Sequence, residues 1–243
     1  MKKIIFVLFI FLSLKTMGGE TIFSKANQQY TNENYTAAIS LYDSIISIGL
    51  ESSEVYYNLG NCHYKRQNWA NAIWHYEKSL NLNANNESAL HNLKITKLKI
   101  IDKVEPIPQL FYKIWWKSII YSFSETSWKI LTLICIWIIL IISLLNKSKN
   151  YNKKYFTLFF SSIVLILFFI TQSLNHNNSK TKAIIFSSSV LVNSSPTINS
   201  TTLFTIHSGT KVELIDQIGD WINIALENGN SGWIKKSDCK IIN

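Results

Sequence analysis

The chain has 243 residues and a net charge of +9, with 24 Lys and Arg against 15 Asp and Glu. Its lysines are scattered along the sequence, and no basic stripe alternates with aromatic residues, which argues against a nucleic-acid partner. The three cysteines form neither a CxxC pair nor a metal-ligand spacing, so no disulfide framework, metal site or cofactor is indicated.

The first 19 residues have the pattern of a secretory signal peptide. A charged start at residues 1–3 precedes an apolar run at residues 4–14, and the small residues Gly18 and Gly19 follow. An uncleaved anchor is the alternative, because the sequence around Gly18 is only a fair cleavage site. Either form exports the rest of the chain.

Residues 20–104 repeat with an offset of 34 residues, which is the tetratricopeptide period. The segment Tyr35–Tyr42 matches Trp69–Tyr76, and the small residues Gly60 and Ala72 would let the two helices of the second repeat approach closely. The second copy therefore resembles a strong tetratricopeptide repeat, and the first copy resembles a diverged one.

A third copy begins at Glu87, but Pro106 and Pro108 prevent a second helix from following. We expect its single helix to cap the stack. The inner faces of the first helices should then share a groove. The residues that register assigns to this predicted peptide-binding groove are Phe23, Asn27, Tyr30, Tyr57, Asn61, Tyr64, Lys65 and His91. Asn amides can bind an extended backbone and Tyr rings can pack on its side chains, although ordinary packing or solvated residues are the alternative at each position.

Residues 105–127 form an aromatic-rich linker. Trp and Tyr favour the headgroup level of a bilayer, so we expect an interfacial helix that contacts membrane lipid through Trp115 and Trp116. A helix packed on the repeats is the alternative.

Two apolar runs follow, at residues 128–145 and 155–174. Spanning a bilayer takes roughly 17–25 apolar helical residues, so the runs predict a two-helix transmembrane hairpin. The loop at residues 146–154 carries four lysines and is expected to be cytoplasmic. Both flanking regions would then lie outside. A pair of buried core helices in a soluble protein is the alternative.

After a polar linker at residues 175–181, short apolar runs separated by turn signals predict a small all-β barrel over residues 182–243. Asn228-Gly229 is a hairpin turn signal. The Gly-Asp-Trp motif ending at Trp221 and the Gly-Trp-Ile motif around Trp233 resemble the bacterial SH3-type domain, which implies binding of cell-wall peptides or proteins. Trp221 is expected in the core, whereas Trp233 is a candidate for the SH3-like binding surface, with a core position as its alternative.

The order of an export signal, repeats, two spans and an SH3-like domain resembles the BatE-type tetratricopeptide proteins of the Bacteroides aerotolerance operon. This family is grouped with membrane proteins that carry von Willebrand factor type A domains and with a MoxR-type ATPase. The resemblance implies a role in an envelope complex with such von Willebrand factor type A-domain partners.

The predicted fold class is therefore a multidomain membrane protein: an α-helical tetratricopeptide repeat domain, a two-helix transmembrane hairpin and a small all-β SH3-like barrel. The predicted location is the cytoplasmic (inner) membrane, multi-pass, with both soluble domains periplasmic. The predicted function is a non-catalytic scaffold that binds protein partners, and the alternative is a peptidoglycan-binding cell-wall sensor or anchor.

An enzyme is not expected. Cys62-His63 with His75 is the only nucleophile–base candidate, and no Asp or Glu is placed to orient either histidine. The sequence also has no Gly-rich phosphate-binding loop.

Overall fold

The structure, a computed structural model, describes residues 21–105, 107–108, 110–120, 122–123, 125–144, 151–178 and 181–242. These residues form two compact units. The helical repeats and the C-terminal sheet belong to one unit (1–106 and 181–243), and residues 107–180 form the other. The predicted signal peptide, residues 1–19, lies outside the described residues, as do residues 146–150 of the predicted loop.

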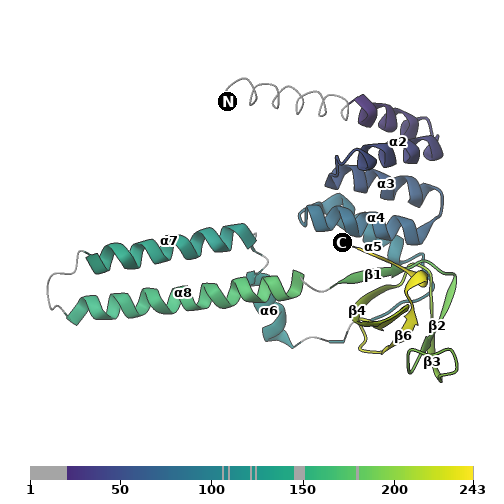
Figure 1. The fold of residues 1–243 in the computed structure, drawn as a ribbon. Coiled ribbons are helices and arrows are strands. Elements are labelled where there is room, and N and C mark those ends of the chain that lie inside the picture. Colours follow the sequence, from purple (N-terminus) through teal and green to yellow (C-terminus); the bar gives the residue numbers. More distant parts are fainter. Residues whose placement is uncertain are drawn as a thin grey trace, which may run out of the picture. The chain divides into compact units, whose positions relative to one another are not determined.

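Helices stack in chain order in the N-terminal part of the first unit (Figure 1). They are a helix at residues 21–31 and then α2 (Tyr35–Ser47), α3 (Ser53–Lys65), α4 (Trp69–Leu82) and α5 (Glu87–Lys97). The arrangement confirms a tetratricopeptide-like helical region: two helix pairs followed by a single helix.

Local sequence explains where these helices begin. The side chains of Ser52, Asn68 and Asn86 accept hydrogen bonds from backbone N–H groups in the first turns of α3, α4 and α5. Each cap satisfies a donor that has no partner within its helix. Small polar N-cap residues therefore fix the start of three successive helices.

Gly60 allows α3 and α4 to approach closely, as the sequence predicted. A Cβ atom at this position would lie 2.5 Å from Cε1 of Tyr76, which is closer than real carbon contacts. Leu59, Ala72 and Ile73 are fully buried around this contact. The packing of the second repeat thus requires a residue without a side chain at position 60.

Residues 182–242 form a seven-stranded antiparallel sheet with strand order β3-β2-β6-β5-β4-β1-β7. The strands are β1 (Lys182–Ile185), β2 (Ser189–Asn193), β3 (Thr202–His207), β4 (Lys211–Ile218), β5 (Trp221–Ala225), β6 (Ser231–Lys235) and β7 (Cys239–Ile241), with a 3-10 helix η1 (Lys236–Asp238) before β7. Gly229 has φ of 87° in the turn between β5 and β6, as the Asn-Gly signal predicted.

The expected core position of Trp221 is wrong. Ile222 and Ile224 of β5 are fully buried, and side chains alternate across a strand, so Trp221 lies on the opposite face, where it is half-buried. Trp233 pairs with Asn223 across β5 and β6 and is also half-buried. The two tryptophans therefore share the outer face of the sheet.

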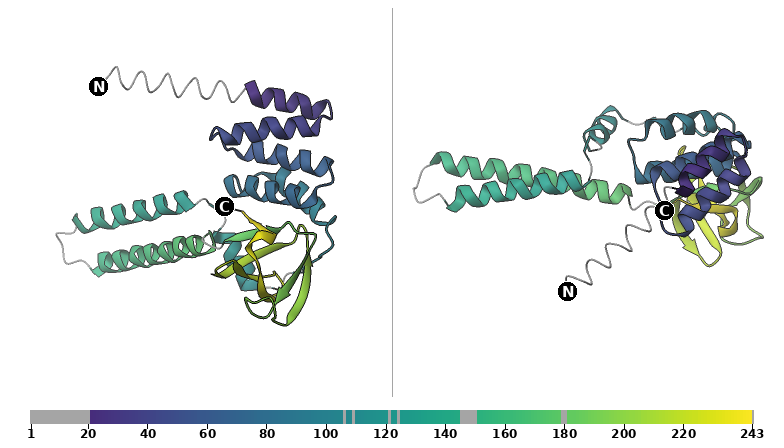
Figure 2. Two further views of the ribbon diagram at one scale, coloured as in Figure 1. Left: turned by 45° about the vertical axis from the view of Figure 1, so that its right-hand side comes forward. Right: turned by 90° about the horizontal axis from the view of Figure 1, so that it is seen from above.

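The second unit contains α6 (Phe111–Ile120), α7 (Glu125–Leu144) and α8 (Tyr151–Asn178). Helices α7 and α8 lie side by side (Figure 2). Trp128 is buried with Ile120, Leu167 and Ile170, and its Nε1 donates a hydrogen bond to the Ile120 carbonyl oxygen at 2.9 Å. In α6, Trp115 is 65% exposed, and its contact with lipid stays a prediction.

The predicted transmembrane hairpin is wrong. Across the residues that the structure describes, none of the helices has both the length and the apolar character that crossing a membrane requires. Charged or polar residues lie within both runs: Lys129 lies near the start of the first, and Ser161 and Ser162 lie within the second. The fold class of a multidomain membrane protein and the multi-pass location in the cytoplasmic membrane, with periplasmic soluble domains, are corrected accordingly. The described fold has a helical repeat region and a separate antiparallel sheet domain.

Candidate functional site

A hydrogen-bonded triad of side chains holds the first Asn of the predicted groove. The Tyr42 hydroxyl of α2 donates to Oδ1 of Asn27, and Nδ2 of Asn58 in α3 donates to the same oxygen at 3.2 Å. Tyr42 is almost fully buried, and burial raises the pKa of its hydroxyl, which therefore stays a donor. The Asn27 carbonyl is thus fully engaged from two helices.

The same triad recurs 34 residues later. The Tyr76 hydroxyl of α4 donates to Oδ1 of Asn61 at 2.8 Å, and Nδ2 of Asn92 in α5 donates to that oxygen at 2.8 Å. Burial also raises the pKa of Tyr76. In both triads the side-chain oxygen of the Asn accepts two hydrogen bonds. These bonds fix the orientation of the Asn side chain, so that its Nδ2 group points away from the two donors.

A pocket of about 170 Å³ lies beside the second triad. Its lining residues are Tyr30, Asn61, Tyr64, Lys65, Asn92 and Ile95. The two tyrosine rings are held edge-on by their neighbours, at 5.5 Å between the centroids of Tyr30 and Tyr35 and 5.3 Å between those of Tyr64 and Trp69. The pocket therefore has rigid aromatic walls and a charged rim at Lys65.

The structure brings together four of the predicted groove residues in this pocket, and the other four do not line it. Phe23 packs edge-on against Tyr42, at 5.8 Å between ring centroids, so it supports the helix pair. The Tyr57 hydroxyl accepts a weak hydrogen bond from Asn92 at 3.4 Å, whereas His91 is exposed and does not line the pocket.

Two pocket residues were missed by the sequence analysis, Asn92 and Ile95. Asn92 lies one 34-residue period after Asn58, and Ile95 lies one period after Asn61. Extending the repeat register fully into α5 would have found both.

The cysteine and histidines considered for catalysis lie together but are suited to packing. Cys62 is fully buried, and burial raises the pKa of its thiol to about 12, which disfavours the nucleophilic thiolate. The rings of His63 and His75 stack with centroids 5.0 Å apart. Burial lowers the pKa of His63 to about 4 and holds the pKa of His75 well below its usual value.

The outer side of α4 contacts the sheet domain through a buried ion pair. The Lys211 ammonium lies 2.6 Å from Oε2 of Glu77, and the Lys97 ammonium lies 3.6 Å from the other carboxylate oxygen. Nearby, a Cβ atom on Gly209 would lie 2.5 Å from Cγ2 of Ile100. The turn between β3 and β4 therefore packs directly on the repeats.

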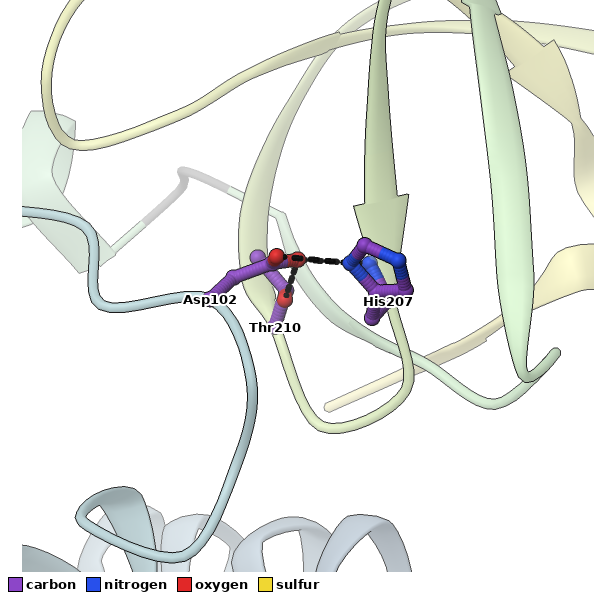
Figure 3. A network of polar contacts seen from close by, with 3 residues as sticks. All are labelled: Asp102, His207 and Thr210. Carbon is purple, nitrogen blue, oxygen red and sulfur yellow. Dashed lines mark hydrogen bonds and ion pairs between the residues drawn. The ribbon is translucent and has the colours of Figure 1, made fainter.

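Asp102 makes a second connection between the repeats and the sheet (Figure 3). Its carboxylate accepts hydrogen bonds from the Thr210 hydroxyl at 2.7 Å and from the backbone N–H of His207, and its Oδ1 lies 2.8 Å from Nδ1 of His207. Burial alone would raise the pKa of Asp102, but these hydrogen bonds lower it below the usual value. The ionised carboxylate thus holds the end of the repeats to the sheet.

The last strand completes this interface. Nε1 of Trp74 donates to the Ile241 carbonyl oxygen and Nδ2 of Asn81 donates to the Ile242 carbonyl oxygen, each at 2.8 Å. The Lys240 ammonium lies 3.6 Å from the centroid of the Trp74 ring. None of the residues in these contacts lines the groove pocket.

Comparison with known proteins agrees with the repeat geometry. The tetratricopeptide repeat family matches residues 53–86, a range that covers α3 and α4. No curated protein matches the chain.

Proposed function

We propose that this chain is a non-catalytic adaptor that binds an extended segment of a partner protein in the groove of its repeats. The tetratricopeptide match supports protein partners in general. The observation that carries the proposal is the repeated triad, in which Tyr42 and Tyr76 fix the side chains of Asn27 and Asn61.

The physical argument rests on preorganised donors. Because each Asn carbonyl is already engaged, the Nδ2 groups of Asn27 and Asn61 are available to carbonyl groups of a bound backbone. A net hydrogen bond contributes ~0.5–1.5 kcal/mol, and little rotamer entropy is lost when the donor is already fixed. Tyr30 and Tyr64 then offer aromatic surface to the side chains of the segment.

The resemblance to BatE-type proteins indicates which partners to test first. Membrane proteins with von Willebrand factor type A domains, as part of an envelope complex, are the proposed class. The sheet domain offers a second surface for the same partner, since it belongs to the same compact unit as the repeats.

Site-specific photo-crosslinking in cells tests the groove. A photoreactive phenylalanine analogue at Tyr57 or Tyr64 should capture the same protein, whereas the analogue at Ser40, which is exposed on α2, should not. Equal capture from Ser40, or no capture from either tyrosine, would contradict the proposal.

The variant Asn61→Asp sharpens this test. Aspartate keeps an oxygen that accepts from Tyr76 and Asn92 but replaces the proposed N–H donor, so capture at Tyr64 should fall while the fold is retained. Asn32→Asp, an exposed residue beyond the first helix, makes the same chemical change as a matched control.

A second candidate function is peptidoglycan binding by the sheet domain. It is favoured by the shared outer face of Trp221 and Trp233, with Lys235 directly opposite Trp221. Aromatic rings beside polar groups suit ligands with both kinds of surface. Sedimentation of the full chain with isolated sacculi, compared with the Trp233→Ala variant, distinguishes this activity: loss of cosedimentation supports it, and no cosedimentation of the parent chain contradicts it.

A further inference from the structure

The pocket beside the second triad presents mainly hydrogen-bond donors. Lys65 contributes an exposed ammonium, Tyr30 and Tyr64 contribute hydroxyls, and Asn61 contributes its fixed amide. Burial raises the pKa of Tyr30, which keeps that hydroxyl protonated. Of the described residues, no Asp or Glu lines this pocket, and no salt bridge is formed with Lys65.

The donors are held in place by contacts outside the pocket. Asn61 is fixed by Tyr76 and Asn92, and the ring of Tyr64 packs edge-on against Trp69. A ligand therefore meets donors whose positions are already set, which reduces the entropy lost on binding. The side-chain carbonyl of Asn92 is available as an acceptor in the pocket, because the amide nitrogen of that residue is engaged.

The surroundings indicate the rest of the ligand. Ile95 lines the pocket, and Leu98, the C-cap residue of α5 and one period after Tyr64, is 69% exposed. Ile95 and Leu98 are three residues apart, so they lie on the same side of the chain at the C-terminal end of α5. A peptide segment in which an apolar residue follows an acidic residue would match the cationic pocket and the apolar side chains beyond it.

We infer that the groove selects an extended acidic protein segment, with an Asp or Glu carboxylate in the pocket beside Lys65 and an apolar side chain near Ile95 and Leu98. This inference rests on the proposed function and specifies the ligand of the same site. A carboxylate accepts charge-assisted hydrogen bonds from an ammonium and is complementary to several converging donors.

Fluorescence anisotropy with the full chain tests the inference. The probe is a short fluorescein-labelled peptide of alternating Glu and Leu, and its comparison is the same peptide with Gln in place of Glu. We expect the Glu peptide to bind about twofold to fivefold more tightly, which is the range for an ion pair with an exposed ammonium. Added salt should reduce the difference, because Lys65 is exposed.

Substitutions at Lys65 locate the effect. Lys65→Glu should weaken binding of the Glu peptide about tenfold or more, and Lys65→Arg should retain most of it. Lys236→Glu makes the same charge change on an exposed residue of the sheet domain and should leave binding unchanged.

The outcomes separate the inference from the proposed function. Equal binding of the Glu and Gln peptides, or full binding by Lys65→Glu, would overturn the carboxylate site while leaving a peptide groove in place. If neither peptide binds, the inference is also overturned, and absence of crosslinks from Tyr57 and Tyr64 would then remove the proposed function as well.

Discussion

Gly60 sets the distance between α3 and α4. Gly60→Ala places a Cβ atom against the Tyr76 ring, so we expect the free energy of unfolding to fall by ~1–3 kcal/mol, as overpacking does. Chemical denaturation measures this change. In a Tyr76→Leu background the added cost should shrink, because the ring that the new methyl group meets is absent; an unchanged cost would contradict the contact.

The stacked pair His63 and His75 should make stability depend on pH. Burial lowers both pKa values in the folded chain, to about 4 for His63, against 6.5 for an ordinary histidine. The neutral rings are therefore favoured by folding. Stability is fully present above about pH 6.5 and is lost as the pH falls from there toward about 4.

Urea denaturation at about pH 7.5 and about pH 5 measures this dependence. The midpoint should be lower at the acidic pH, and His63→Gln should flatten the difference. His91→Gln changes an exposed histidine and should not alter it. A midpoint that is independent of pH in the parent chain would rule out the buried neutral pair as the cause.

At the scale of elements, the contact between α4 and β4 depends on Glu77. Burial lowers the pKa of Lys211, whereas the charge and hydrogen bond of Glu77 act to raise it. Glu77→Gln leaves the Lys211 ammonium buried without its main counter-charge, so we expect a loss of about 3–5 kcal/mol in unfolding free energy.

A double variant separates the ion pair from simple packing. Glu77→Leu with Lys211→Met removes both charges and should restore most of the stability that Glu77→Gln loses. Glu54→Gln, an exposed acid in the first turn of α3, is the control and should have little effect. A double variant as unstable as Glu77→Gln would show that the ion pair is not the cause.

The elements that the sequence predicted well are those with a local pattern. The 34-residue period predicted the helix pairs around Gly60, and turn residues such as Gly229 indicated where strands end. The docking of the sheet on α4 has no such signal, because Trp74 and Ile241 are 167 residues apart in the chain. For the site, register found Asn27 and Asn61, but only the structure shows that their carbonyl groups are already engaged.

At the scale of the whole molecule, residues 107–180 are an insertion within the first unit. Val104 packs on the core of the sheet domain, and Lys182 pairs with Glu213 of β4, so both connections lie on that domain. Replacing residues 107–180 by a Gly/Ser linker should therefore leave one cooperative unfolding transition. Circular dichroism during thermal unfolding measures it.

A fragment that contains only residues 20–104 is the comparison for this deletion. It exposes the outer side of α4, including Trp74, which is 7% exposed in the whole chain. We expect it to unfold at a lower temperature than the linked chain. Two separate transitions in the linked chain, or equal stability of the fragment, would contradict a shared unit.

Ile184 and Ile242 belong to the same apolar cluster as the repeat residues from Ala26 to Leu93. During synthesis, the repeats leave the ribosome before the segments that contain Ile184 and Ile242. The apolar surface of the nascent repeats must therefore stay open to solvent until the segment that contains Ile184 and Ile242 has been synthesised. Protection of that surface by a chaperone in this interval would favour a high yield of folded protein.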